Sequence, residues 1–136
     1  MNTTVAFFIT PKVLIKYLDE TLTVRQAIEM MDFHHYSAVP LLKSNGEYLG
    51  VVSVGDILWY LKDHNFDNEE AMKKNIKEVK QTREYKSICI DTQIEELART
   101  IINQTFVPVT DDRNMFIGIV TRKTVMNQLL QESSKK

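Results

Sequence analysis

Apolar and polar positions along the chain form a pattern that occurs twice. Residues 38–53 read as two short apolar runs around a polar turn, which predicts a β-hairpin. Residues 106–121 have the same form, and the second strand of each hairpin carries an aliphatic-glycine-aliphatic step, at Gly50 and at Gly118. These glycines lie 68 residues apart, and the prolines of the two first strands have the same separation. The pattern therefore predicts an internal repeat.

Helical periodicity flanks both hairpins. Apolar residues recur at positions i, i+3, i+4 and i+7, which places them on one face of a helix. The segments with this spacing are Val24–Met31 and Val54–Leu61 in the first copy, and Ile94–Ile101 and Arg122–Leu129 in the second, where Arg122 replaces the first apolar residue. Thr23 with Gln26 predicts a capping box at the first helix start. Thr92 with Glu95 predicts the same in the second copy.

Each copy therefore reads strand–helix–strand–strand–helix, which predicts a mixed α/β (α+β) fold. We expect the first repeat over residues 1–66, a partly helical connecting segment over 67–78, the second repeat over 79–130, and a frayed tail over 131–136. One repeat of about 60 residues is marginally stable alone, so we expect both to share a core as one module with pseudo-two-fold symmetry.

Charge and cysteine content narrow the function classes. The chain has 136 residues, of which 43% are hydrophobic, and its 17 basic and 18 acidic side chains give a formal net charge of −1. This balance argues against nucleic acid as the main partner, because nucleic-acid-binding domains usually carry a basic excess. Cys89 is the only cysteine, and no signal-peptide core or membrane span fits the N-terminal apolar runs. A cytoplasmic protein without membrane contact is expected.

Ligand chemistry is expected at the helix starts rather than in a glycine-rich loop, because the four glycines of the chain form no such motif. Backbone N–H groups and the positive end of the helix dipole attract anions there. In each copy a hydroxyl residue, Ser53 or Thr121, ends the hairpin and opens the following helix. Asp56 suits the two hydroxyls of a ribose, but Ser53 with Asp56 is equally typical of a capping box that serves only the helix.

The second copy departs from the first at its helix start. Thr124 occupies the position of Asp56, so the second copy lacks the acid. Arg122 and Lys123 follow Thr121 directly, and two cations at this place would favour a more highly charged phosphate. The alternative interpretation is a solvated basic pair on a surface turn.

The doubled pattern resembles a tandem pair of CBS (cystathionine-β-synthase) domains, also called a Bateman module. Residues 50–56, Gly-Val-Val-Ser-Val-Gly-Asp, resemble the family signature of a glycine, then Ser or Thr three residues later, then Asp or Asn three residues after that. Further matching segments are residues 8–11, 36–40, 106–108 and 118–121. The resemblance covers roughly residues 5–130 and fails at Thr124.

The resemblance implies a regulatory module that binds an adenosine-containing ligand in clefts between the repeats and requires no cofactor. It implies a first site in which Asp56 contacts the ribose and Ser53 the phosphate. The adenine would contact the backbone of Lys12, Val13, Leu14, Tyr36, Ser37 and Ala38, beside Pro40. The second site would use Thr82, Lys86, Phe106, Val107 and Thr121, and it lacks the sugar-binding acid because Thr124 stands in its place. For a cyclic dinucleotide, the basic pair Arg122 and Lys123 would face the adenine pocket of the first copy.

A narrower resemblance concerns the ligand. Small CBS pairs without an attached enzyme occur in Gram-positive bacteria, and some are similar in binding cyclic di-AMP. The segments that look like this subgroup are residues 12–14, 36–38, 102–107 and 121–123. AMP, ADP, ATP and cyclic di-AMP all remain candidates, with cyclic di-AMP the leading one. Asp56 suits a free ribose diol, whereas a 3′,5′-linked ring offers only the 2′-hydroxyl.

No catalytic role or metal site is expected, because the sequence shows no nucleophile with a base, no paired carboxylates and no metal-ligand spacing. A second hypothesis is a dimeric protein-interaction module that needs no ligand. The resemblance implies homodimers in which the last helix of each repeat lies at the interface. Either hypothesis includes a regulated partner protein, which the sequence does not name.

Overall fold

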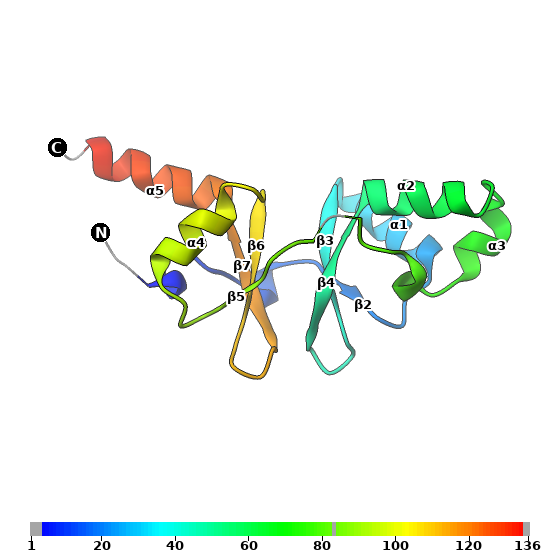
Figure 1. Cartoon of the computed structure of the whole chain (residues 1–136), viewed down its shortest axis with the longest axis horizontal. Coiled ribbons are helices and arrows are strands. Elements are labelled where there is room, and N and C mark those ends of the chain that lie inside the picture. The colour runs from blue at the N-terminus through cyan, green and yellow to red at the C-terminus, as the bar shows by residue number, and fades with distance from the viewer. Residues whose placement is uncertain (1–3, 83, 135–136) are drawn as a thin grey trace. The chain divides into compact units, whose positions relative to one another are not determined.

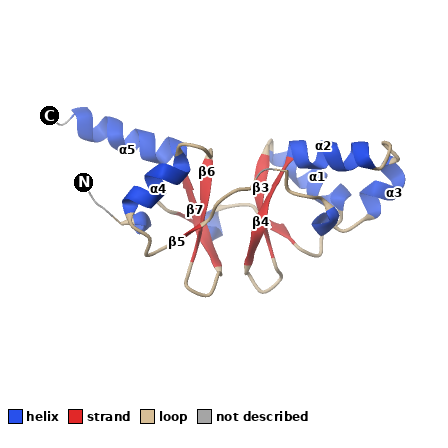
Figure 2. Cartoon of the chain, in the orientation of Figure 1, coloured by secondary structure: helices blue, strands red, loops and turns tan. Residues whose placement is uncertain are grey.

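The computed structural model describes residues 4–82 and 84–134, and its elements follow the order expected from the repeat. The first repeat contains β2 (Leu18–Asp19), α1 (Val24–His34), β3 (Ala38–Leu42), β4 (Tyr48–Ser53) and α2 (Val54–Asp63). The second contains β5 (Ile88–Cys89), α4 (Ile94–Ile101), β6 (Phe106–Thr110), β7 (Phe116–Thr121) and α5 (Arg122–Ser134). The strand–helix–strand–strand–helix order and the mixed α/β class are therefore confirmed (Figure 2).

Short elements precede and follow the first repeat. They are η1 (Val5–Phe7), β1 (Thr10–Pro11), η2 (Lys12–Leu14), α3 (Asn68–Lys73) and η3 (Ile76–Glu78), where η marks a 3₁₀ turn. The connecting segment is partly helical, as predicted. It is also part of the core, because Ala71, Ile76 and Val79 are buried. The polar composition of this segment did not indicate that role.

The chain folds as two compact units whose limits differ from those of the sequence repeats. The middle unit comprises Lys16–Glu84, and the terminal unit comprises Met1–Ile15 with Tyr85–Lys136. The short segment that leads into each repeat thus belongs to the unit built by the other repeat. In the terminal unit, β1 pairs antiparallel with β7.

The middle unit is a three-stranded sheet covered by helices. Its strand order is β2-β3-β4, with β2 parallel to β3 and β3 antiparallel to β4. Helices α1 and α2 lie on one face of this sheet (Figure 1). The buried cluster of this unit consists of Leu18, Val24, Ala27, Met31, Val39, Leu41, Val52, Ile57, Tyr60, Ala71, Ile76 and Val79.

The terminal unit has a four-stranded sheet in the order β1-β7-β6-β5. Its own buried cluster consists of Val5, Phe8, Ile88, Leu97, Ile101, Val107, Val109 and Val120. The described residues thus contain two clusters of buried side chains, one in each unit. Each unit closes its core with the helices of one repeat and the leading segment of the other.

The helix starts confirm one predicted capping box and refute the other. The Thr23 hydroxyl accepts the Gln26 N–H at 3.2 Å, and the Gln26 side chain accepts the Thr23 N–H at 2.9 Å. The capping box of Thr92 with Glu95 is wrong, because α4 has Gln93 as its N-cap and no side-chain cap bond. Thr92 lies one residue too early to cap this helix.

Helix α5 reaches the end of the described part of the chain. Residues 131–134, expected as a frayed tail, belong to this helix, and residues 135–136 of that tail lie outside the described residues. Among the helices of the described residues, none is both long and apolar enough to cross a membrane.

The repeated glycines allow the leading segments to approach the second hairpin strand. A Cβ atom on Gly50 would overlap the side chain of Gln81, and one on Gly118 would overlap the carbonyl oxygen of Thr10. At Gly118 the overlap is with backbone, so glycine is needed there for close packing, whereas at Gly50 it is with the end of a flexible side chain.

Candidate functional site

The start of α2 brings Ser53 and Asp56 together in a complete capping box. The Ser53 hydroxyl accepts the Asp56 N–H at 3.1 Å, and Asp56 Oδ2 accepts the Ser53 N–H at 2.9 Å. Ser53 has the extended backbone conformation that an N-cap requires. The capping box of this pair is therefore present, and it engages one oxygen of Asp56.

The other oxygen of Asp56 is bonded to Thr82. Asp56 Oδ1 accepts the Thr82 N–H at 2.8 Å and the Thr82 hydroxyl at 2.6 Å. Asp56 is only 3% exposed, so these donors replace the water that a carboxylate would otherwise bind. The sequence interpretation assigned Thr82 to the second site; the structure instead places it on the acid of the first repeat.

Hydrogen bonding decides the ionisation of Asp56. Burial acts to raise the pKa of its carboxyl group. The bonds from the Thr82 hydroxyl and N–H, and from Ser53, outweigh burial and hold the pKa of Asp56 below its usual value. Asp56 is thus a buried, ionised acceptor at neutral pH.

The backbone N–H groups at the start of α2 are partly engaged already. The Val54 N–H donates to the Ser37 carbonyl at 2.9 Å, and the Asp56 N–H donates to Ser53. Two of the first three helical N–H groups therefore have partners within the chain. A phosphate at this place would depend on the Gly55 N–H, the Ser53 hydroxyl and the helix dipole.

The start of α5 has the same backbone arrangement with different chemistry. The Arg122 N–H donates to the Thr105 carbonyl at 2.9 Å, as Val54 does to Ser37. The Thr121 hydroxyl accepts the Thr124 N–H at 3.1 Å, and the two threonine hydroxyls lie 2.8 Å apart. A neutral hydroxyl pair thus replaces the carboxylate.

Arg122 is bonded to the end of α4 rather than extended over the start of its own helix. Its Nε and one terminal nitrogen donate to the carbonyls of Ile101 and Ile102, each at 3.1 Å. A cation at a helix C-terminus stabilises the carbonyl groups that lack helical partners. Lys123 is exposed beside it. The predicted phosphate role of Arg122 therefore competes with a structural one.

The predicted adenine segment 36–38 lies directly before the start of α2. Tyr36 is 39% exposed, and its ring stacks on His34 with 5.5 Å between ring centroids. Ala38 pairs with Ser53 across the β3–β4 hairpin, so these residues lie side by side. Pro40, further along β3, is buried.

The remaining predicted residues lie in the terminal unit. Lys12, Val13 and Leu14 form η2, and Val13 and Leu14 are 86% and 74% exposed. Phe106 pairs with Thr121 across the second hairpin. The side chain of Val107 belongs to the core, so only its backbone is placed to meet a ligand.

Sequence reasoning included Gln104 in the segment 102–107 but gave its side chain no role. It is 5% exposed, and its side chain bonds the N–H of Lys86 at 2.7 Å and the carbonyls of Lys86 and Phe106 at 3.1 and 3.0 Å. Gln104 thus fixes the predicted ligand residue Lys86 to β6, and an isolated glutamine carries no sequence signal for that role. Within the described residues, no three His, Cys, Asp or Glu side chains gather as a metal site.

The repeat has a counterpart among known families. The family model of the CBS domain matches residues 8–63 and 76–131. The chain belongs to the CBS-domain family. Both matches begin in the leading segment and end within the helix that follows the hairpin, so the start of α2 and the start of α5 are equivalent places in two CBS domains.

Curated relatives are longer than this chain. An uncharacterized protein of Methanocaldococcus jannaschii is 28% identical over 138 residues, which cover 100% of this chain and 48% of the relative. A homoserine O-acetyltransferase of Methanocorpusculum labreanum is 25% identical over 118 residues, covering 84% of this chain and 22% of that enzyme. The chain thus spans half or less of the length of these relatives.

Solved CBS structures share the fold. The crystal structure of CbpB in complex with cyclic di-AMP has a TM-score of 0.87 at 23% identity and covers 97% of this chain and 89% of that one. The crystal structure of CBSX2 in complex with AMP has a TM-score of 0.77 at 24% identity, with 97% and 99% covered. At these identities the likeness establishes the fold alone.

Proposed function

We propose that this chain is a cytoplasmic regulatory module that binds an adenine nucleotide at the start of α2 and relays its occupancy to a partner protein. The observation that carries this proposal is Asp56, a buried carboxylate held in its ionised form at a helix start beside a serine hydroxyl. A structural cap alone does not need so many donors, because Ser53 already completes the capping box without Thr82.

The geometry fits the parts of a nucleotide. Asp56 is the acceptor for a ribose hydroxyl, since hydrogen bonds to a charged group are the stronger ones. The Ser53 hydroxyl and the N-terminus of α2 suit a phosphate. Residues 36–38, which adjoin Ser53 across the hairpin, supply backbone groups for the adenine edge.

The ligand class is supported by relatives of the same fold. CbpB is solved with cyclic di-AMP, and CBSX2 with AMP. Both are adenine nucleotides, so adenine recognition is the chemistry that they share. We propose one strong site, at the start of α2, because the start of α5 offers Thr124 in place of the acid.

A regulatory role is proposed in preference to a catalytic one. Asp56 is the acid that the site offers, and the bonds from Ser53 and Thr82 hold its pKa below the usual value. A carboxylate with a lowered pKa is a weak general base at neutral pH but a good hydrogen-bond acceptor, which favours ligand binding.

A thermal-shift screen of the purified protein with AMP, ADP, ATP, cyclic di-AMP and cyclic di-GMP tests the proposal. A ligand present at 100 times its dissociation constant stabilises the folded protein by about 2.7 kcal/mol. We expect stabilisation by an adenine compound, its loss in Asp56→Ala, and its retention in the matched variant Thr124→Ala. The absence of a shift with every adenine nucleotide would refute nucleotide sensing.

A second candidate function, a homodimeric interaction module, is favoured by an apolar groove in the middle unit. The groove has a volume of about 480 Å³ and lies between α1 and α2. It is lined by Ile28, Met31, Asp32, His35, Tyr36, Val54, Ile57, Leu58, Leu61 and Met72. Leu58 and Trp59 are 48% and 50% exposed, and apolar surface of this kind marks interaction sites.

Sedimentation velocity on the wild-type protein and on Leu58→Glu tests the dimer. We expect a dimer that the charged side chain converts to a monomer with unchanged helix content. Lys62→Glu, an exposed change on the same helix, is the matched control and should leave the assembly unchanged.

A further inference from the structure

Thr82 occupies part of the hydrogen-bonding capacity of Asp56. A carboxylate offers about four acceptor positions, two on each oxygen. The Thr82 N–H and hydroxyl take both positions on Oδ1, and the Ser53 N–H takes one on Oδ2. Within the described residues, one acceptor position on Oδ2 therefore has no donor.

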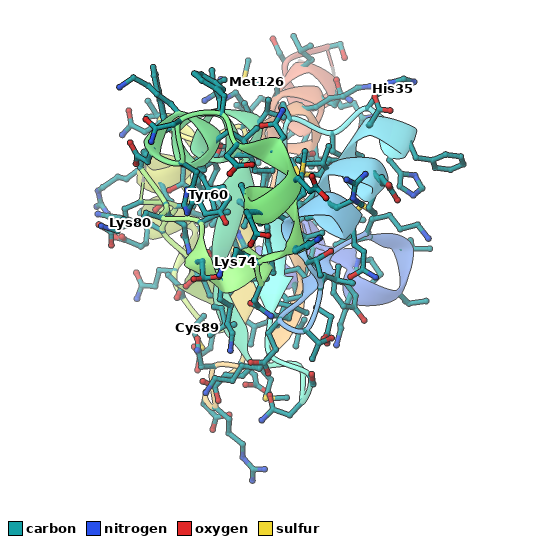
Figure 3. All side chains as sticks on the ribbon, turned by 90° about the vertical axis from the view of Figure 1, so that its right-hand side faces the viewer. His35, Tyr60, Lys74, Lys80, Cys89 and Met126 are labelled. Atoms are coloured by element: carbon teal, nitrogen blue, oxygen red, sulfur yellow. The ribbon has the colours of Figure 1, made fainter. Side chains whose placement is uncertain are left out.

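The segment that carries Thr82 is anchored on β4 one residue earlier. The Gln81 side-chain oxygen accepts the Val51 N–H at 3.2 Å, and its amide lies against Gly50 where a Cβ would otherwise be. Thr82 and the preceding Lys80 are exposed, with Lys80 labelled in Figure 3. Thr82 is thus positioned by its neighbour and donates its hydroxyl to Asp56.

Two kinds of adenine nucleotide make different demands on Asp56. A 5′-mononucleotide has a free 2′,3′-diol, and bidentate donation to the carboxylate needs two acceptor positions. A 3′,5′-linked nucleotide has only the 2′-hydroxyl and needs one. The structure offers one while the Thr82 hydroxyl is in place.

We propose that Thr82 is a specificity-determining residue, which limits Asp56 to one ribose hydroxyl and so favours 3′-linked adenine nucleotides over 5′-mononucleotides. This inference rests on the proposed nucleotide site at Asp56. The 3′-hydroxyl of a mononucleotide contributes nothing to binding by the wild-type protein. Removal of the Thr82 hydroxyl frees one acceptor position on Oδ1. The 3′-hydroxyl of a mononucleotide can then donate to this position and contribute to the binding affinity.

Titration calorimetry with AMP, 3′-deoxy-AMP and cyclic di-AMP tests this on the wild-type protein, Thr82→Val and Thr82→Ser. Valine removes the hydroxyl and keeps the shape of the side chain, whereas serine keeps the hydroxyl and is the matched control. Thr82→Ala repeats the loss of the hydroxyl with a smaller side chain, and thermal unfolding verifies that each variant is folded.

In the wild-type protein and in Thr82→Ser, AMP and 3′-deoxy-AMP should bind within about two-fold of each other. In Thr82→Val and Thr82→Ala, AMP should bind about ten-fold more tightly than 3′-deoxy-AMP, as one additional hydrogen bond to a carboxylate provides. The preference for cyclic di-AMP over AMP should fall by a similar factor.

An equal ratio of AMP to 3′-deoxy-AMP affinity in all four proteins would overturn the role of Thr82 and leave the nucleotide site standing. A ten-fold preference for AMP already present in the wild-type protein would overturn it as well. If the wild-type protein binds none of AMP, ADP, ATP and cyclic di-AMP, the proposed function fails, and this inference fails with it.

Discussion

The starts of α2 and α5 have the same backbone and different chemistry. In both, a hydroxyl residue accepts the N–H three residues later, and the first helical N–H donates to the residue before the hairpin, Ser37 or Thr105. At α2 the third position carries the buried, ionised Asp56. At α5 it carries Thr124, whose hydroxyl is hydrogen-bonded to the Thr121 hydroxyl.

The comparison separates what the fold needs from what a ligand needs. Both helices start correctly, so a carboxylate is not required to begin the helix of a CBS repeat. Asp56 is buried as an ion, and the hydrogen bonds from Ser53 and Thr82 offset the cost of burying its charge; the repeat with Thr124 needs no such bonds. The start of α2 has a feature that the start of α5 lacks, an acid with Thr82 bonded to it, and this is the feature to which we propose that the ligand binds.

The two helix starts should differ most in stability when the third helical residue, Asp56 in α2 or Thr124 in α5, is replaced by alanine. Asp56→Ala removes the acceptor of three hydrogen bonds and should lower the free energy of unfolding by about 2–3 kcal/mol. Thr124→Ala removes one hydroxyl bond and should cost about 1 kcal/mol or less. Urea unfolding at pH 7 measures the loss of unfolding free energy in both variants. Equal losses would contradict the proposed difference between the two helix starts.

Part of the contribution of Asp56 to the free energy of unfolding should depend on pH. The pKa of Asp56 is lowered in the folded protein, so its stabilisation is present above the unfolded value of about 3.9 and is lost as the pH falls through the folded value. The stability difference between the wild-type protein and Asp56→Asn should therefore shrink from pH 7 to pH 3. A difference that grows on acidification would contradict the lowered pKa.

A smaller effect on stability is expected at the start of α5, where Arg122 contacts the end of α4. Arg122→Ala removes the two bonds to the carbonyls at the end of α4 and should cost about 1 kcal/mol. The neighbouring exposed Lys123→Ala should change stability by less than about 0.5 kcal/mol. If neither change lowers the free energy of unfolding in urea, the contact of Arg122 with α4 does not stabilise the fold.

The smallest expected effect comes from giving α5 the missing acid. Thr124→Asp should accept the Thr121 N–H, as Asp56 does for Ser53, and raise the free energy of unfolding by about 0.5 kcal/mol. Thr124→Asn separates the hydrogen bond from the charge. A loss of stability with the aspartate alone would show that this helix start does not tolerate a carboxylate.

Local features of this fold were readable from the sequence. The spacing of apolar residues predicted the order of strands and helices, and Thr23 with Gln26 predicted a cap, because these depend on neighbours within one or two turns. The cap at Thr92 failed by one residue, since Gln93 lies where Thr23 lies in the first repeat.

Contacts between distant residues were not readable in this way. Thr82 reaches Asp56 across 26 residues, and Arg122 reaches Ile101 across 21. Neither pairing follows from periodicity, because each depends on a leading segment or a helix end that tertiary structure brings near. The burial of Ile76 within a polar segment has the same origin.

The central claim, one nucleotide site at the start of α2, is tested most directly by titration calorimetry with cyclic di-AMP and AMP. It predicts that the wild-type protein and Thr124→Ala bind an adenine nucleotide with equal affinity and stoichiometry. It predicts at least a ten-fold loss of affinity in folded Asp56→Ala, because a charge-assisted bond to the ribose is removed. Undiminished binding by Asp56→Ala, or a loss confined to Thr124→Ala, would contradict the account.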